Sequence, residues 1–489
     1  MKFLDEHQRD QIGFSFVMDK LLITTAYGLH ERRNIKPFKS SEINQLTHEL
    51  NGIENIIKSM NSHIEEYNVI GRIFCRLKDI RNSIKRCSEA QTLDEVELYE
   101  IKYFSILVSE LKNVLAKLHL DIGEVHLNSL EGIISILDPQ GKGIPTFYVY
   151  DEYSKALKYV RDAKKQKEKE ITTSKNQEKI NELKQQRLDL VIEEEEEELR
   201  IRNELTFQIS KEAKMINQNI KAIGRLDFLI AKANLSIAYN GTRPEICDEM
   251  KIHIDSAFNP KINEILEKGN KVFSPVSIDL NAGTTIITGA NMGGKSVTLK
   301  TIVLNLLLGQ MGFFVFAEKA QFPILNFIHF VSDDMQSISK GLSTFGAEII
   351  KLKDVVECAK IENGFIALDE FARGTNPKEG YYLVKSLAKY LSTFQSVSLI
   401  STHYDGVVEA NMEHYQVMGL KKVDFNALKY RIDENKTHSV EIIQEHMDYT
   451  LEKVSKENEV PKDALNIAVL LGLENEIIDI AKSFYNEED

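Results

Sequence analysis

The sequence is poor in the features that mark secreted, metal-binding and membrane-spanning chains. Its 489 residues include four scattered cysteines, Cys75, Cys87, Cys247 and Cys358, with no close pair at metal-ligand spacing. It has no run of about eighteen uncharged apolar residues, and the charged start MKFLDEHQRDQ is unlike a signal peptide. These absences predict buried free thiols rather than disulfides or zinc, and a cytoplasmic protein without a membrane partner.

Basic residues are also fewer than acidic ones: the chain has 61 basic and 74 acidic residues, and its net charge is −13. Such a protein cannot coat nucleic acid with its whole surface, so any DNA contact is expected to be local. One stretch could present a basic helix surface, although ordinary solvated surface is the commoner explanation. Its residues are Arg72, Arg76, Lys78, Arg81, Lys85 and Arg86.

The length predicts two or three units. Apolar residues at three-and-four spacing, such as Ile53, Ile56, Ile57 and Met60, predict an all-α core domain over residues 1–150. Few glycines or prolines interrupt this pattern up to about residue 143. The stretch IPTFYVY, residues 144–150, is a short β-type segment.

Residues 151–235 predict a long antiparallel helical hairpin, because two apolar helical stripes are separated by a break at Thr172, Thr173 and Ser174. The return helix could run for about 60 residues, or roughly 90 Å, which suits a lever. Within it lie six consecutive glutamates, Glu193 to Glu198. They form either a solvated helix face or an acidic docking site for a basic partner.

Residues 236–489 alternate short apolar runs with amphipathic helical patterns, which predicts an α/β domain with a mostly parallel sheet. A β-type segment, residues 284–288, precedes the pattern Gly-x-x-x-x-Gly-Lys-Ser and then an apolar helix, as a P-loop requires. Lys295 is expected to neutralise nucleotide phosphates, and Ser296 to hold Mg²⁺. The expected nucleotide contacts here are Gly289, Asn291, Met292, Gly293, Gly294, Lys295, Ser296 and Val297.

Two later strand ends carry the other candidate catalytic groups. The apolar run 365–368 leads into Asp369 and Glu370, and the run 396–400 leads into Ser401, Thr402 and His403. Strand ends of this kind hold ligands in α/β sheets. Asp369 suits the Mg²⁺ shell, Glu370 suits polarising an attacking water, and His403 suits sensing the γ-phosphate.

Four segments resemble motifs of the MutS family, in the family's order and at similar spacing. TGANMGGKS resembles its P-loop, GLSTFGAEI its signature segment, LDEFARGT its acidic strand end, and LISTHYDGV its histidine segment. The resemblance covers essentially the whole chain and is strongest from Ile223 onward. It implies an ABC-type ATPase that uses ATP and Mg²⁺ as a homodimer, or as a heterodimer with a related subunit. In such a dimer, Ser343 and Thr344 begin the loop that reaches the partner's nucleotide.

The departures from the family shape the expected function. Ala290, Val297, Phe371, Ala372 and Glu474 differ from its motifs, and the acidic stretch from His438 to about Lys462 has no recognised counterpart. The family's N-terminal mismatch reader, with its Phe-x-Glu motif, and a C-terminal nuclease-like extension are both missing. The hairpin also contains too little non-helical sequence for the β-rich DNA clamp of the family. The expected function is therefore an ATPase acting on DNA structures in repair or recombination without reading mismatches. The alternative is an ATP-driven reactivase for a cobalamin-dependent aminomutase, favoured by the acidity.

Overall fold

A computed structural model describes residues 2–118, 122, 125–143, 146–289, 294–332, 344–420, 423–434, 439–454 and 463–487. Contacts divide the chain into two compact units. The sheet unit consists of Met1–Leu21, Lys36–Leu50 and Asn234–Asp489, and the helical unit consists of Leu22–Ile35 and Asn51–Ala233. The three domains predicted from the sequence, with boundaries near residues 150 and 235, stay a prediction.

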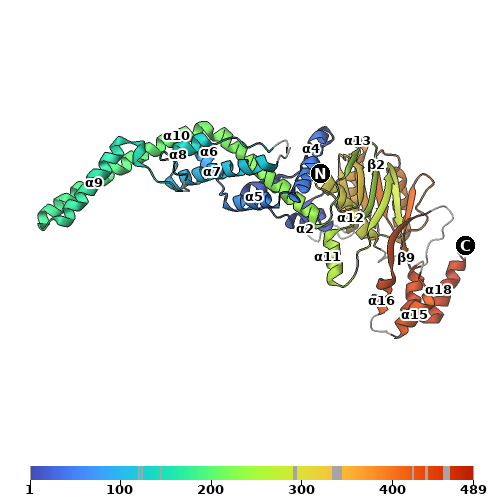
Figure 1. Ribbon diagram of the computed structural model, residues 1–489. Coiled ribbons are helices and arrows are strands. Elements are labelled where there is room, and N and C mark those ends of the chain that lie inside the picture. The colour runs from blue at the N-terminus through green and yellow to red at the C-terminus, as the bar shows by residue number, and fades with distance from the viewer. Residues whose placement is uncertain are drawn as a thin grey trace. The chain divides into compact units, whose positions relative to one another are not determined.

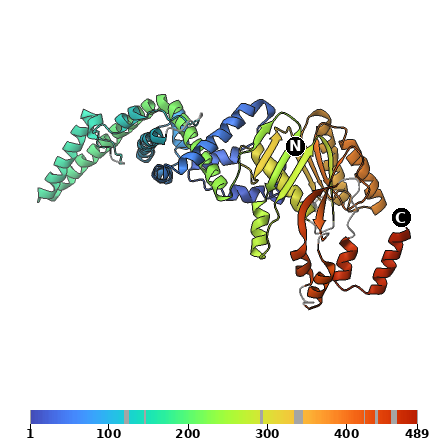
Figure 2. The ribbon, with the colours of Figure 1, turned by 45° about the vertical axis from the view of Figure 1, so that its right-hand side comes forward.

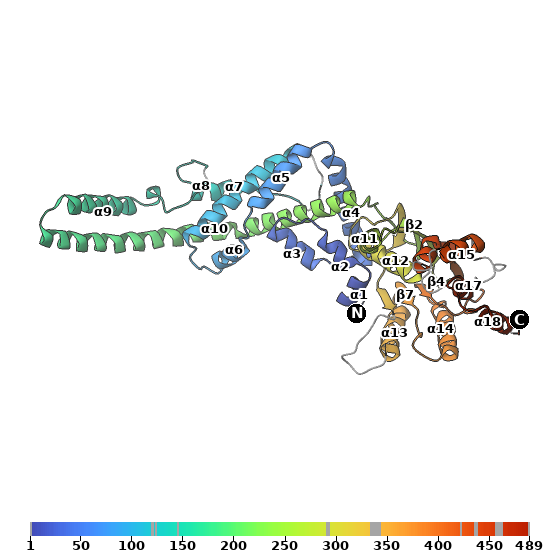
Figure 3. The same cartoon turned by 90° about the horizontal axis from the view of Figure 1, so that it is seen from below.

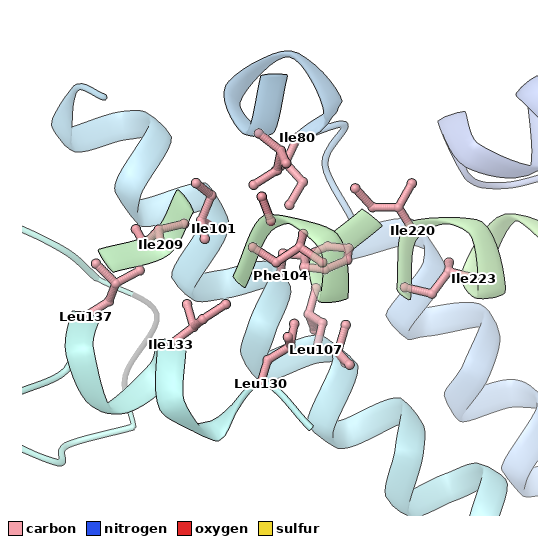
Figure 4. Packing of buried hydrophobic residues seen from close by; sticks show 14 of the residues in the cluster. Ile80, Ile101, Phe104, Leu107, Leu130, Ile133, Leu137, Ile209, Ile220 and Ile223 are labelled. Atoms are coloured by element: carbon pink, nitrogen blue, oxygen red, sulfur yellow. The ribbon is translucent and has the colours of Figure 1, made fainter. Parts of the chain in front are cut away.

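The helical unit is built from amphipathic helices around one apolar core. Phe104 of α7, Ile133 of α8 and Ile220 of α10 lie in the same cluster of buried side chains (Figure 4). Burial of each such side chain contributes about 1.5–3 kcal/mol, so this core holds the helices together. The helices are α3 (Ala26–Asn34), α4 (Ile43–Met60, which begins in the sheet unit), α5 (Ile64–Arg76), α6 (Arg81–Ser88), α7 (Glu95–Leu118), α8 (Glu131–Leu137), η2 (Asp151–Tyr153), α9 (Lys155–Thr173) and α10 (Gln177–Ala238, which ends in the sheet unit).

A buried carboxylate and a glycine attach α3 closely to α10. Asp227 Oδ2 accepts hydrogen bonds from the Thr25 backbone N–H and hydroxyl, both at 2.7 Å. Gly224 lies so near α3 that an added Cβ would be 2.9 Å from the Tyr27 carbonyl oxygen. Burial raises the pKa of Asp227, and the hydrogen bonds from Thr25 and Thr24 oppose that shift. The lack of a Cβ at Gly224 and the hydrogen bonds to the Asp227 carboxylate together fix α3 on the surface of α10.

Residues 146–150 show where the β-type expectation is wrong, because none of these described residues belongs to a strand. Instead, Lys102 Nζ donates to the Thr146 carbonyl oxygen at 2.9 Å. The rings of Phe147 and Tyr148 pack against Tyr150, with centroids 5.8 and 4.1 Å apart. Side-chain packing and a buried cation therefore fix a segment whose residue types alone favour a strand.

Two helices occupy the region of the predicted hairpin: α9 ends at Thr173, and α10 begins at Gln177 and runs for 62 residues (Figures 1 and 3). The break between them lies at residues 174–176, later than the predicted Thr172 to Ser174, because Thr172 and Thr173 still belong to α9. Ion pairs join the two helices. Arg161 of α9 contacts Glu194 of α10 at 3.0 Å and Glu198 at 2.7 Å. Glu194 also pairs with Lys164 of α9. Electrostatic contacts across the hairpin therefore supplement its apolar stripe.

Three of the six glutamates in the run Glu193 to Glu198 form ion pairs within the protein. Besides Glu194 and Glu198, Glu197 pairs with Arg200 at 2.6 Å. Arg200 and the Ser154 hydroxyl lower the pKa of Glu197 to about 2. These contacts support the interpretation of the run as an ordinary helix face and weaken its interpretation as a docking site.

The ion-pair network of Arg161 gives a stability prediction. We expect Arg161→Met to lower the free energy of unfolding of the hairpin by about 1–3 kcal/mol, because it leaves partly buried carboxylates without their cation. Hydrogen exchange of the α9 amides would measure the loss. Arg187→Met is the matched control, since its pair with Glu168 is exposed on both sides and is expected to contribute less than about 1 kcal/mol. Equal effects of the two substitutions would contradict a special role for Arg161.

The sheet unit contains a six-stranded and a four-stranded sheet. The six-stranded sheet has the order β10-β9-β4-β8-β7-β6, parallel except for the antiparallel edge strand β10, and the four-stranded sheet has the order β1-β5-β2-β3. The strands are coloured yellow-green to red in Figure 2. They are β1 (Glu245–Cys247), β2 (Lys251–Ala257), β3 (Val276–Asn281), β4 (Gly283–Thr288), β5 (Lys319–Pro323), β6 (Ile328–Ser332), β7 (Phe365–Asp369), β8 (Val397–Ser401), β9 (Glu413–Gly419) and β10 (Asp448–Lys453).

One apolar helix, α12, contacts both sheets: β7 and β8 of the larger one, and β2 and β3 of the smaller one. Nearly all of its side chains are buried. This burial is expected, because the sequence of the helix has no polar face. Helices α13 and α14 contact β6 and β4 respectively (Figure 3). The helices of this unit are α1 (Glu6–Gln11), α2 (Phe14–Asp19), η1 (Ser40–Glu42), α11 (Pro260–Lys268), α12 (Lys295–Gln310), α13 (Thr344–Ile361), α14 (Pro377–Leu391), α15 (Phe425–Glu434), α16 (Ser439–His446), α17 (Asp463–Leu470) and α18 (Asn475–Glu487).

All four cysteines are free thiols. Cys87 is buried as expected. The expectation of burial is wrong for the other three, because Cys75 is exposed on α5 and Cys247 and Cys358 are half-buried. Across the described part of the chain, no helix combines the length and the apolar character needed to cross a membrane.

Candidate nucleotide site

Four parallel strands end together at one edge of the six-stranded sheet. The register places Asp369 of β7 opposite Ser401 of β8, and Ser401 opposite Ile287 of β4. The residues that follow these strands, Gly289 and Glu370 among them, therefore leave the sheet at the same edge. In sheets of this type, that carboxyl edge is where ligands bind.

Two glycines frame the connection from β4 to α12. Gly289 has φ of 136° and Gly294 has φ of 83°, a backbone conformation that residues with a Cβ rarely adopt. A Cβ on Gly294 would also lie 3.1 Å from the ring of Tyr449. The expected contacts Asn291, Met292 and Gly293 lie outside the described residues. The strand and the helix on either side of the connection are present as predicted.

Lys295, the first residue of α12, turns its side chain back toward this connection. It is only 3% exposed. Its Nζ donates to the Gly289 carbonyl oxygen at 2.7 Å and lies 3.4 Å from Glu370 Oε1. Burial lowers the pKa of Lys295, while the Glu370 carboxylate opposes that shift. The buried ammonium is thus held by two oxygens that a phosphate group could replace.

Asp369 and Ser296 meet at the start of α12. The Ser296 side chain lies close enough to the Asp369 carboxylate to lower its pKa. The Ser401 hydroxyl donates to Asp369 Oδ1 at 2.7 Å. Burial raises the pKa of Asp369, and the side chains of Ser401 and Ser296 oppose the shift. A carboxylate beside a hydroxyl supplies the hard oxygen ligands that Mg²⁺ takes in proteins, so the two side chains fit this cation.

Glu370 is held in an unusual backbone conformation directly after β7. Its φ is 49°, in the left-handed region that a residue with a side chain occupies at a cost of about 1–3 kcal/mol. Its backbone N–H donates to Ser401 Oγ at 3.2 Å, and its Oε2 accepts from Arg373 at 2.8 Å. The carboxylate therefore lies between two cations, Lys295 and Arg373. Sequence reasoning singled out neither Arg373 nor Ser401 as a partner of these carboxylates.

His403 lies two residues beyond the end of β8 and is exposed. Partial burial lowers the pKa of its imidazole, Glu370 opposes this shift, and Lys295 adds to it. His403 is not among the residues that line the adjacent cavity. Its ring packs on Tyr404, with centroids 4.2 Å apart.

A cavity of about 660 Å³ opens beside these groups. Gly294, Lys295, Ser296, Val297 and Glu370 line one side of it. The opposite side comes from segments remote in sequence, represented by Val272, Phe273, Met447 and Tyr449. The aromatic and apolar wall was not anticipated from the sequence. Tyr449 and Met447 also lie within the acidic stretch that had no recognised counterpart, where β10 forms the edge strand of the large sheet.

The signature segment is described only in part. Ser343 lies outside the described residues, and Thr344 is the first residue of α13. Farther along this helix, the buried Glu348 accepts a hydrogen bond at 3.1 Å from the backbone N–H of Ala372. Because Ala372 follows Glu370 by two residues, α13 is connected directly to the loop that carries the candidate catalytic carboxylate.

Comparison with known proteins matches the part of the chain that carries Lys295, Asp369 and Glu370. Residues 285–487 match the family model MutS domain V. Endonuclease MutS2 of Acetivibrio thermocellus is 32% identical over 302 residues, 62% of this chain and 35% of that protein. Endonuclease MutS2 of Staphylococcus epidermidis is 32% identical over 244 residues, 48% of this chain and 30% of that protein. The chain thus spans about a third of the length of the curated relatives it matches. Residues 285–487 thus match domain V of the MutS family, and the chain is similar to proteins named Endonuclease MutS2.

Proposed function

We propose that the sheet unit binds ATP with Mg²⁺ and hydrolyses it. One observation carries this proposal: Lys295 and Ser296 at the start of α12 lie near the carboxylates of Asp369 and Glu370 at the end of β7, beside one cavity. Phosphoryl transfer needs little more than positioning and neutralisation of charge, which are the capacities of these groups. The cavity volume of about 660 Å³ falls within the range of small-molecule sites.

Each side chain has a distinct role in this proposal. Lys295 exchanges the Gly289 carbonyl and Glu370 for phosphate oxygens. Ser296 and Asp369 hold Mg²⁺, which when bound neutralises charge on the phosphates. Glu370, fixed by Arg373, orients and polarises the attacking water. His403, whose lowered pKa favours the neutral imidazole at neutral pH, responds to the γ-phosphate.

We further propose that the chain acts as a dimer, either with itself or with a related subunit. Ser343 and Thr344 would then reach the nucleotide of the partner. The hydrogen bond between Glu348 and Ala372 supports this idea, because movement of α13 on partner binding would reach the loop of Glu370 directly. The nucleotide state of the site and the contact with the partner would thus be coupled through the hydrogen bond between Glu348 and Ala372.

DNA is the ligand that we propose for the ATP-driven cycle, in repair or recombination. The support is the similarity to proteins named Endonuclease MutS2. The basic stretch of the helical unit contributes less than expected, because four of its side chains are ion-paired: Arg76 with Glu110, Arg81 with Asp79, Lys85 with Glu89, and Arg86 with Glu97. Binding through a few local contacts, rather than a broad basic surface, is therefore proposed.

A binding titration tests the DNA proposal. Linear duplex, a four-way junction and a mismatched duplex would be titrated at several salt concentrations, with and without ATP. We expect affinity to fall by about 0.9 log unit per neutralised phosphate for each log unit of salt, with a preference for shape over sequence. The Lys295→Ala variant is the control for the ATP effect. Failure to bind any of the three at low salt would eliminate DNA and leave the aminomutase reactivase as the alternative.

A further inference from the structure

The helical unit contains a second cavity, of about 950 Å³, which belongs to no part of the nucleotide site. Its lining is rich in cationic and amide groups. Lys221 and Arg225 of α10 and Arg81 of α6 contribute permanent positive charges, and Glu31 of α3 contributes the lining carboxylate. His30, His126, Asn128, Asn217 and Gln218 add hydrogen-bonding side chains.

The cationic groups are placed by the fold rather than scattered over a surface. Lys221 and Arg225 are four residues apart in α10 and so share one face of the helix. The attachment of α3 to α10 through Asp227 and Gly224 sets the opposite wall, which carries His30 and Glu31. Arg81 lies over the Tyr27 ring, 5.8 Å from its centroid, and is held by both carboxylate oxygens of Asp79.

Electrostatics favour an anion in this cavity. Asp79 pairs with Arg81. Among the described residues of the lining, Arg81, Lys221 and Arg225 are the permanent cations and Glu31 is the carboxylate. Burial lowers the pKa of Arg225, and Glu31 opposes the shift. Two turns farther along α10, burial and then the charge of Arg225 lower the pKa of the fully buried Lys232. The described lining thus carries more cationic than anionic groups, and this balance attracts an anion.

We propose that this cavity binds a phosphate-bearing ligand, with Arg225 and Lys221 as its principal contacts. The planar guanidinium of Arg225 can hold two phosphate oxygens at once, and Lys221 adds a point charge. The amides of Asn128 and Gln218 suit the remaining polar atoms of the ligand. The volume corresponds to a ligand of nucleotide size rather than to a lone ion. The phosphate could belong to a soluble phosphorylated molecule or to a DNA strand.

Calorimetric titration with pyrophosphate separates this cavity from the nucleotide site. We expect one binding site in each unit of the unmodified chain. Lys295→Ala should remove the site in the sheet unit, and Lys221→Glu should weaken the other by about tenfold or more, since it replaces a charge-assisted contact by repulsion. Arg225→Lys keeps the charge but loses the planar fork, so a smaller loss is expected. Lys214→Glu, an equally exposed change on α10 outside the cavity lining, is the matched control.

The same variants then identify the source of the phosphate. In the Lys295→Ala background, a labelled single-stranded oligonucleotide would be titrated by anisotropy. Pyrophosphate binding that Lys221→Glu weakens and Lys214→Glu leaves intact supports a soluble ligand. The same dependence for the oligonucleotide alone supports a DNA phosphate. Binding of neither probe in the Lys295→Ala background, or equal binding by the Lys221→Glu and Lys214→Glu variants, would overturn the proposal. Neither result would bear on ATP hydrolysis by the sheet unit.

Discussion

Replacing Glu370 by Gln is expected to lower ATP turnover by about a hundredfold or more, while the chain still binds ATP. The amide has nearly the same shape as the carboxylate, so the left-handed backbone at Glu370 and its N–H bond to Ser401 are preserved. The negative charge that polarises the water is lost. Because Glu370 also competes with phosphate for Lys295, ATP affinity should be unchanged or tighter.

Single-turnover hydrolysis and equilibrium ATP binding, measured on the same preparations, would check this result. Glu379→Gln on α14 is the matched control, since Glu379 is an exposed glutamate outside the cavity lining. Near-normal turnover in the Glu370→Gln variant would remove this residue from the catalytic role. Loss of ATP binding would instead mean that Glu370 mainly orders the site through Lys295 and Arg373.

The sequence was sufficient to predict those parts of the fold that depend on local patterns. The end of β7 at Asp369 and the start of α12 at Lys295 follow from apolar runs and glycine positions in neighbouring residues. The break before α10 lies at residues 174–176, close to the predicted break at Thr172 to Ser174. Such signals act within a few residues, where backbone preferences and burial pattern decide the structure.

The remaining features depend on contacts between segments far apart in the chain. The left-handed conformation of Glu370 is set by its hydrogen bonds to Ser401 and Arg373. The residue type at position 370 does not predict this conformation. The cavity wall from Phe273 and Tyr449 arises only when β10 joins the sheet beside β9. Residues 146–150 failed as a strand for the same reason, since Lys102 and the packing of aromatic rings outweighed β-propensity.

Replacing Lys295 by Ala is expected to weaken ATP binding itself, by roughly a hundredfold or more. The ammonium would form charge-assisted hydrogen bonds to two phosphates, and each such bond contributes about 1.5–3 kcal/mol, which together correspond to at least about a hundredfold in affinity. Its position favours a large effect, because it is 3% exposed and water cannot readily replace it.

Equilibrium titration with a fluorescent ATP analogue would measure this loss, and circular dichroism would establish that the variant is folded. Lys268→Ala is the control, because Lys268 is an exposed lysine paired with Glu264 at the end of α11. The two substitutions in the site separate binding from chemistry: Lys295→Ala lowers affinity, whereas Glu370→Gln lowers turnover of bound ATP. A folded Lys295→Ala variant with unchanged affinity would show that the buried ammonium serves only to hold Gly289 and Glu370, and the nucleotide site would then have to lie elsewhere.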